Sequence, residues 1–170
     1  MDELFSGIEI ARKVKSLLEA AENYIYIMQF LLFNVKNVND GKENINLNLI
    51  DILKRKKDEG LEVKLILSHP RKLSDDMQPR QFESIKELAL YEIPLLLCEE
   101  VHHKFLIIDN AIMHGSANFT FTGLSGKRDE LVYTENGNLL KQFQTLFLKR
   151  WIQKDNVCLN CENKCKKFYF

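Results

Sequence analysis

The residues best suited to chemistry lie together near the middle of the chain, in the segment VHHKFLIIDNAIMHGSANFT, residues 101–120. A histidine pair and a lysine precede an apolar run that ends at an aspartate. In an extended strand alternate side chains share a face, so His102 and Lys104 project together while His103 points the other way. A cation favours the neutral, nucleophilic form of a nearby imidazole and attracts phosphate oxygens. The pattern predicts phosphate chemistry on one strand face.

Small polar residues follow this strand. Gly115 provides a turn, Ser116 a hydroxyl and Asn118 a carboxamide. These groups are suitable donors for the nonbridging oxygens of a phosphodiester, and they need no metal to act. The segment therefore predicts a metal-free phosphodiester site.

Together these residues resemble the HKD motif of the phospholipase D superfamily, over roughly residues 8–151. The matching positions are His102, Lys104, Asp109, Gly115, Ser116 and Asn118. The family usually has six residues between the aspartate and the glycine, whereas residues 110–114 supply five here. This difference predicts a hairpin turn one residue shorter than is usual.

The resemblance implies that His102 attacks phosphorus to form a covalent phosphohistidine. A second histidine would protonate the leaving oxygen and later activate water. The chain carries one such motif, so the resemblance implies a homodimer in which two copies of His102 face each other across a twofold axis. It also implies that Asp109 orients or stabilises the histidine of its own motif, and that Glu130 in KRDELVY holds the partner imidazole.

The other three histidines lack these surroundings. We expect His103 to face the core or to be hydrogen-bonded, and His114 to belong to a hairpin. His69 follows a predicted strand, where bordering the pocket and lying in an ordinary loop are equal alternatives.

Periodicity predicts the elements that position the site. Helices are expected near residues 10–18, 49–59, 82–91 and 139–151, and strands at 24–33, 63–67, 95–98 and 130–135. Residues 105–108 and 111–113 read as a hairpin, and residues 34–48 as a loop. This alternation predicts an α/β fold with a mixed β-sheet flanked by helices on both faces, in a single catalytic domain over residues 1–155, with a Cys/Lys-rich tail at 156–170.

Composition places few limits on the partners. Lys plus Arg equals Asp plus Glu at 24 each, although residues 141–170 hold seven basic residues against two acidic ones. That surplus fits either a polyanion or a solvated helix face. The longest apolar run, residues 24–33, is about half of what a bilayer requires, and the acidic N-terminus resembles no secretory signal. We therefore expect no transmembrane segment and a cytoplasmic protein.

The C-terminal cysteines raise a separate question. Cys158, Cys161 and Cys165 have the close spacing of metal-binding thiolates, but three ligands are one short of a structural zinc site. Cys98 or one of the histidines could complete it. Structural zinc and free thiols both stay open, and no cofactor is expected for catalysis.

Three functions remain after these considerations. The first is a nuclease acting on DNA or RNA, since small single-motif relatives often cleave nucleic acid. The second is a phospholipid hydrolase of the cardiolipin type, for which the aromatic end CKKFYF offers a membrane-facing suggestion. The third is a catalytically silent module that only grips phosphate, and the intact His102 and Lys104 argue against it.

Overall fold

A computed structural model of the chain describes residues 2–99 and 101–152. Its elements are β1 (Glu3–Ser6), α1 (Glu9–Ala20), β2 (Tyr24–Gln29), β3 (Asn37–Asn39), β4 (Asn44–Asn46), α2 (Leu49–Asp58), β5 (Glu62–Ser68), a 3-10 turn (Pro70–Lys72), α3 (Gln78–Leu90), β6 (Leu95–Cys98), β7 (Lys104–Ile108), β8 (Ala111–Gly115), α4 (Phe121–Leu124), β9 (Glu130–Thr134) and α5 (Gly137–Ile152).

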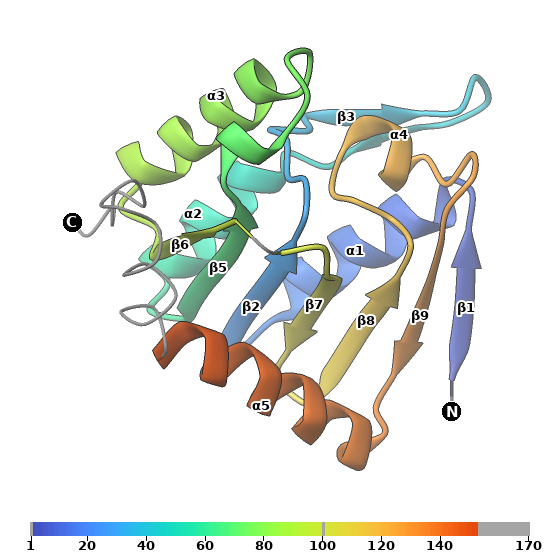
Figure 1. Cartoon of the computed structure of the whole chain (residues 1–170). Helices are drawn as coiled ribbons and strands as arrows, with labels where there is room; N and C mark the ends of the chain where they lie inside the picture. The colour runs from blue at the N-terminus through green and yellow to red at the C-terminus, as the bar shows by residue number, and fades with distance from the viewer. Residues whose placement is uncertain (1, 100, 153–170) are drawn as a thin grey trace.

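Seven strands form one mixed sheet in the order β1-β9-β8-β7-β2-β5-β6 (Figure 1). Strands β2, β5 and β6 run parallel, and the other neighbours pair antiparallel. The parallel pairs need long crossovers, which α2 and α3 supply, whereas β7 and β8 are joined by a tight turn at Asp109 and Asn110. The predicted α/β fold with a mixed sheet is confirmed.

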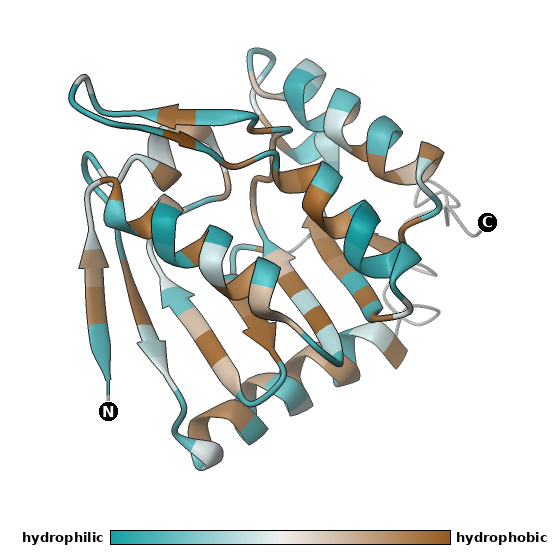
Figure 2. Ribbon diagram, turned by 180° about the vertical axis from the view of Figure 1, so that it is seen from behind, coloured by the Kyte–Doolittle hydropathy of each residue, from teal (hydrophilic) through white to brown (hydrophobic). Residues whose placement is uncertain are grey.

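Helices cover both faces of the sheet and create two cores. Helices α1, α2 and α3 pack on one face, where a large cluster of buried Ile, Leu and Val side chains lies (Figure 2). Helix α5 covers the other face with Phe147, Phe143 and Leu140. Strand β2 is buried on both sides, which explains why its sequence is almost continuously apolar. Strand β2, which lies inside the sheet between β7 and β5, is therefore held by packing on both faces.

Local structure departs from the sequence predictions in several places. Helix α3 begins at Gln78, four residues before the predicted start, with Pro79 in its first turn, where the missing N–H costs no hydrogen bond. The predicted long strand at residues 24–33 leaves the sheet after Gln29. Strand β1 was not predicted because it is a short, mostly exposed edge strand that pairs on one side with β9.

The predicted loop at residues 34–48 contains the two-stranded hairpin β3–β4, with Val38 buried. Its base is closed by hydrogen bonds from the N–H groups of Leu47 and Asn48 to Lys36 O, at 2.8 and 2.9 Å. Asn and Gly content signalled the turn but hid the strands, because only one buried apolar residue marks β3.

Within the described ranges, 2–99 and 101–152, none of the helices combines the length and the apolar character that crossing a bilayer requires. The expected boundary between the catalytic domain and the tail, at residues 155–156, lies outside the described residues.

Candidate active site

His102 and Lys104 lie on the same side of the chain, at the start of β7. The Nζ atom of Lys104 lies 3.3 Å from His102 Nδ1 and donates to His102 O at 3.0 Å. The ring of Phe30 stacks obliquely on His102 at 4.8 Å between centroids, and Lys104 Nζ lies 5.6 Å from the centre of the Phe30 ring. His102 is exposed and Lys104 half-buried. A phosphate could therefore reach both groups from solvent.

Burial lowers the pKa of Lys104, and the negative charge of Asp129 partly offsets that effect. Lys104 is therefore less hydrated than an ordinary surface lysine. A weakly hydrated ammonium interacts more strongly with a phosphate oxygen. The surroundings of Lys104 suit anion binding.

The carboxamide of Asn118 is oriented by the backbone. Its Oδ1 accepts a hydrogen bond from the N–H of Leu31 at 3.2 Å, which leaves the amide hydrogens to donate elsewhere. The backbone of Asn118 lies close to Gly123, and this approach requires glycine, because a Cβ at position 123 would collide with the carbonyl oxygen of Asn118. Thr120 Oγ1 accepts from Gly123 N at 3.2 Å and caps α4. These contacts hold Asn118 as a donor.

Asn118 and Asp129 line a common cavity of about 370 Å³ that opens beside β2, α3 and α4. Asp129 directly precedes β9. It lies on the face of the sheet that α1, α2 and α3 cover, where Leu131 and Leu106 are buried. Asp129 also interacts electrostatically with Lys104. Asp129 was not singled out from the sequence. The signal available was alternation along β9, which places residues 129 and 131 on one face.

The role implied for Glu130, holding the partner imidazole, stays a prediction, and the geometry within one chain favours Asp129 instead. Alternation directs the side chain of Glu130 to the face opposite Asp129, and that side chain is exposed. Its backbone is used instead, because its N–H donates to Ser116 Oγ at 3.0 Å and its carbonyl accepts from Ser116 N at 3.0 Å. Ser116 therefore ties β8 to β9, and an added Cβ at Gly115 would collide with the same carbonyl.

The resemblance implies that Asp109 orients or stabilises His102, and within one chain this is wrong because the two residues lie at opposite ends of β7. Asp109 lies at the opposite end of β7, in the turn to β8, at a φ of 50°. Its carboxylate accepts from the N–H groups of Glu22, Asn23 and Tyr24 at 2.9, 2.9 and 3.0 Å. Burial by itself would raise the pKa of Asp109, but these donors outweigh it and lower the pKa. Asp109 anchors the turn to the start of β2.

The side chains of the remaining histidines make other contacts. His103 points to the α5 face, where it meets Phe105 edge-on at 6.2 Å, and its Nδ1 is buried without a hydrogen-bond partner in the described part of the chain. His114 lies in β8, as predicted, and packs on Phe143. His69 Nδ1 accepts from Arg71 N at 3.2 Å and caps the 3-10 turn.

No group of three or more metal-binding side chains occurs among the described residues. Cys158, Cys161 and Cys165 lie outside those residues, and Cys98 is buried in β6.

Comparison with known proteins assigns the family. The family model described as cardiolipin synthase, PLD-like domain, matches residues 14–151. A segment of 65 residues is 34% identical to the mitochondrial cardiolipin hydrolase of Danio rerio, and it covers 38% of this chain and 29% of that relative. The chain thus spans less than a third of the curated relative that it matches.

Solved structures share the fold at low identity. The phospholipase D family member Nuc from Salmonella typhimurium is 19% identical, with a TM-score of 0.66, over 90% of this chain and 96% of Nuc. NucT from Helicobacter pylori is 15% identical, with a TM-score of 0.64, over 88% and 94%. The chain belongs to the phospholipase D superfamily, a family of phosphodiesterases, through its PLD-like domain.

Proposed function

We propose that the chain is a nuclease that hydrolyses phosphodiester bonds of DNA or RNA through a phosphohistidine at His102. The observation that carries this proposal is the pairing of His102 with Lys104 at 3.3 Å, and Lys104 interacts electrostatically with Asp129, which lines a cavity with Asn118. The pair offers a nucleophile and a cation for the phosphate oxygens, and Asn118 offers further hydrogen-bond donors.

The reaction proceeds in two displacements. Nε2 of His102 attacks phosphorus, an N–P bond forms, and the bond to the leaving oxygen breaks with its electron pair. That oxygen takes a proton from a second imidazole, which then removes a proton from the water that cleaves the N–P bond. None of these steps uses a metal.

The second imidazole is the partner's His102 in this proposal. The other histidines of the chain are used elsewhere, since His103 and His114 pack on the α5 face and His69 caps a turn. A twofold dimer supplies two identical histidines to one site. Asp129 takes the role first assigned to Glu130 and accepts a hydrogen bond from the partner imidazole.

Binding of substrate sets the tautomer of His102. Without substrate Lys104 lies at hydrogen-bond distance from Nδ1, which engages the Nδ1 lone pair and leaves the proton on Nε2. Attack through Nε2 requires the proton on Nδ1. The substrate phosphate draws Lys104 away from Nδ1. Nδ1 can then carry the proton and donate a hydrogen bond to the carboxylate of the partner's Asp129.

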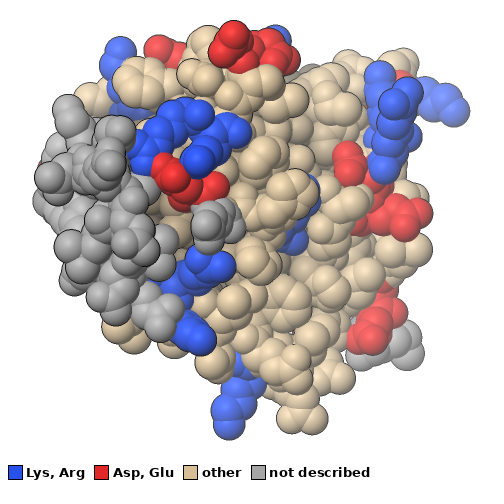
Figure 3. All heavy atoms as spheres, viewed as in Figure 1, with Lys and Arg blue, Asp and Glu red and all other residues tan. Residues whose placement is uncertain are grey.

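Two of the solved structures with this fold, Nuc and NucT, span nearly the same length as this chain. Nucleic acid is preferred to phospholipid because small relatives of this kind often cleave nucleic acid. TrmBL2, an archaeal chromatin protein whose structure shows a mode of DNA binding, shares the fold at 20% identity, with a TM-score of 0.58. Charge adds little on the face drawn in Figure 3, where basic and acidic side chains lie close to one another around a mostly uncharged area. Four of the seven basic residues of the C-terminal surplus lie outside the described residues.

The test compares wild type with His102→Ala on a bis-aryl phosphodiester, then on single- and double-stranded DNA and RNA and on vesicles containing cardiolipin. Wild type should hydrolyse the aryl diester and nucleic acid, with at least a 1000-fold loss in the variant. Equal turnover by the two proteins would leave only a phosphate-binding module. Cleavage of vesicle lipid without cleavage of nucleic acid would make the chain a phospholipid hydrolase.

Zinc at Cys158, Cys161 and Cys165 is a separate proposal, and its role would be structural. It predicts one zinc per chain by elemental analysis of the full-length protein. Aryl diester hydrolysis should persist in chelator, whereas its loss there would contradict the metal-free mechanism.

A further inference from the structure

A second cavity continues from the one at Asn118 and Asp129. Its volume is about 650 Å³, and its walls include Phe33, Arg80 and Phe121, all three of which also line the smaller cavity. The two cavities therefore adjoin at these three residues, and together they are called the groove. The mechanism described above uses only the first part of this groove.

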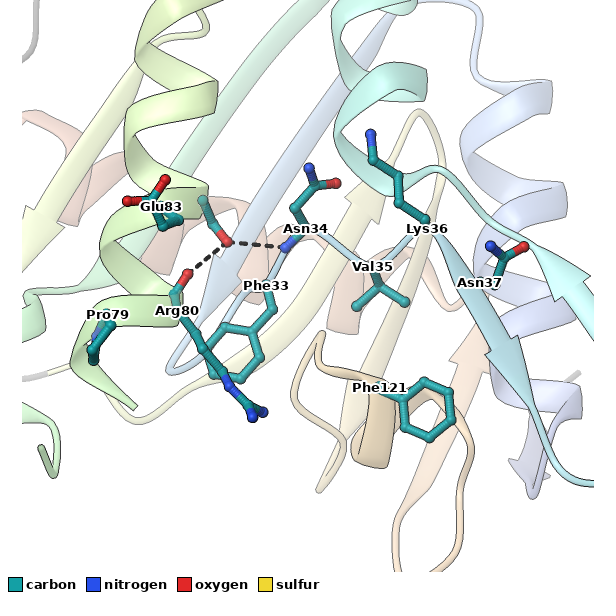
Figure 4. A pocket seen from close by; sticks show the side chains of 10 residues that line it. Phe33, Asn34, Val35, Lys36, Asn37, Pro79, Arg80, Glu83 and Phe121 are labelled. Atoms are coloured by element: carbon teal, nitrogen blue, oxygen red, sulfur yellow. Dashed lines mark hydrogen bonds between the residues drawn. The ribbon is translucent and has the colours of Figure 1, made fainter. Parts of the chain in front are cut away.

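Two aromatic side chains from distant parts of the sequence form the walls of the second cavity. Phe33 follows β2, and Phe121 is the first residue of α4. Figure 4 shows Phe33 and Arg80 on one side of the cavity and Phe121 on the other. Phe121 is 45% exposed, so much of its ring surface is open to a ligand. A flat ring that entered the groove would find an aromatic face to stack on.

Polar groups accompany these rings. Arg80 lines both cavities and interacts electrostatically with Asp76. The carboxamide of Asn37 lies among the lining residues of the second cavity, whereas that of Asn34 is bonded to Glu87. A nucleobase has edges that pair with carboxamides, and its phosphate would meet Arg80. An acyl chain would cover these groups without pairing them. The lining favours a base over a lipid tail.

The cavity is already shaped in the unliganded protein. Ser84 Oγ accepts from the N–H of Asn34 at 2.9 Å and donates to the carbonyl of Arg80 at 3.0 Å (Figure 4). The bond from Asn34 ties the segment after β2 to α3, and the bond to Arg80 fixes the hydroxyl of Ser84 on α3. The segment after β2 and α3, which both line the cavity, therefore keep their spacing. A ligand would need little ordering of the protein in order to bind.

We propose that the second cavity is a base subsite that takes one unpaired nucleobase near the scissile phosphate. The base stacks on Phe121 and Phe33, and Arg80 contacts the phosphate that links it to the reacting nucleotide. A base in a duplex is stacked and paired and must be pulled out before it can enter, so the subsite selects single-stranded nucleic acid. This inference rests on the proposed nuclease function.

The test measures affinity in a His102→Ala background, where the substrate is not turned over. Two single-stranded 10-mers of equal charge are compared, one with thymine bases and one abasic throughout. The background protein should prefer the base-containing strand by about 10-fold or more. Phe121→Ala should lose most of that preference, and Phe121→Trp should retain it.

Phe82→Ala is the matched control, because Phe82 is 55% exposed on α3 and does not line the cavity. It should keep the preference for the base-containing strand, and melting temperatures should show that all variants are folded. If Phe121→Ala keeps the preference while wild type cleaves single strands, the base subsite is wrong and the nuclease stands. If wild type cleaves only vesicle lipid, and Phe121→Ala weakens vesicle binding, the groove takes an acyl chain and both proposals fail.

Discussion

Lys104 Nζ lies 3.3 Å from His102 Nδ1, and the same ammonium donates to the backbone carbonyl of His102. The two side chains of the motif are thus in contact before any phosphate arrives, and this contact rests on the two-residue spacing along the start of β7. The spacing His-x-Lys has a direct structural meaning, since any other separation would place the groups on different faces or different pleats.

The pH dependence of the reaction should report Lys104. Its pKa is lowered from the ordinary value of 10.5, so its charge is lost at a lower pH than that of a surface lysine. The alkaline limb of kcat/KM on the aryl diester, which reflects the free enzyme, should begin below pH 10.5. Lys104→Arg should move that limb upward because arginine stays charged. An unchanged limb in the variant would assign it to another group.

Asp129 and Glu130 should differ sharply despite their adjacency. Asp129 lines the cavity with Asn118, whereas Glu130 contributes its backbone to Ser116 and exposes its side chain. Asp129→Asn should lower kcat by on the order of 100-fold, while Glu130→Gln should stay within about twofold of wild type. Steady-state kinetics of the two variants shows which of the two carboxylates supports catalysis. The reverse ranking would restore the assignment made from the sequence.

Asp109 should matter to stability more than to chemistry. Its folded pKa lies below the ordinary 3.8, so its ionised form stabilises the fold. That contribution is complete above pH 3.8 and is lost as the pH falls below it through the folded pKa. Asp109→Asn should therefore lower the free energy of unfolding by about 1–3 kcal/mol at pH 7.

The difference between wild type and Asp109→Asn should shrink on acidification below pH 3.8, as measured by urea unfolding across a pH series. Asn accepts the φ of 50° at this position, so the comparison isolates the carboxylate from backbone strain. A gap that stays constant with pH would show that the charge contributes nothing.

Mixed dimers test whether two copies share one site. If both copies of His102 are required, a mixture of wild type with His102→Ala, refolded or exchanged to equilibrium, should lose activity as the square of the wild-type fraction. A linear loss would show that each chain works by itself. Sedimentation at the assay concentration checks that the mixture is dimeric.

The sequence indicated the frame of the site better than its details. The buried strands, the β7–β8 hairpin and the shared face of His102 and Lys104 follow from periodicities of 2 and 3.6, which short segments carry by themselves. Motif matching placed Asp109 beside His102, which is wrong within one chain, and it did not single out Asp129. The surroundings of these residues depend on pairing between segments distant in sequence, such as Asp109 with residues 22–24 and Ser116 with Glu130.

The β3–β4 hairpin is closed at its base by the N–H groups of Leu47 and Asn48 on Lys36 O, and Leu49 N donates to Val35 O at 3.0 Å where α2 begins. The length of the hairpin is therefore independent of the sheet, and extending it costs little closure entropy. Lys36 and Asn37, at its base, line the second cavity. A change of length in this one segment would therefore reshape the second cavity, while His102 keeps its place just before β7.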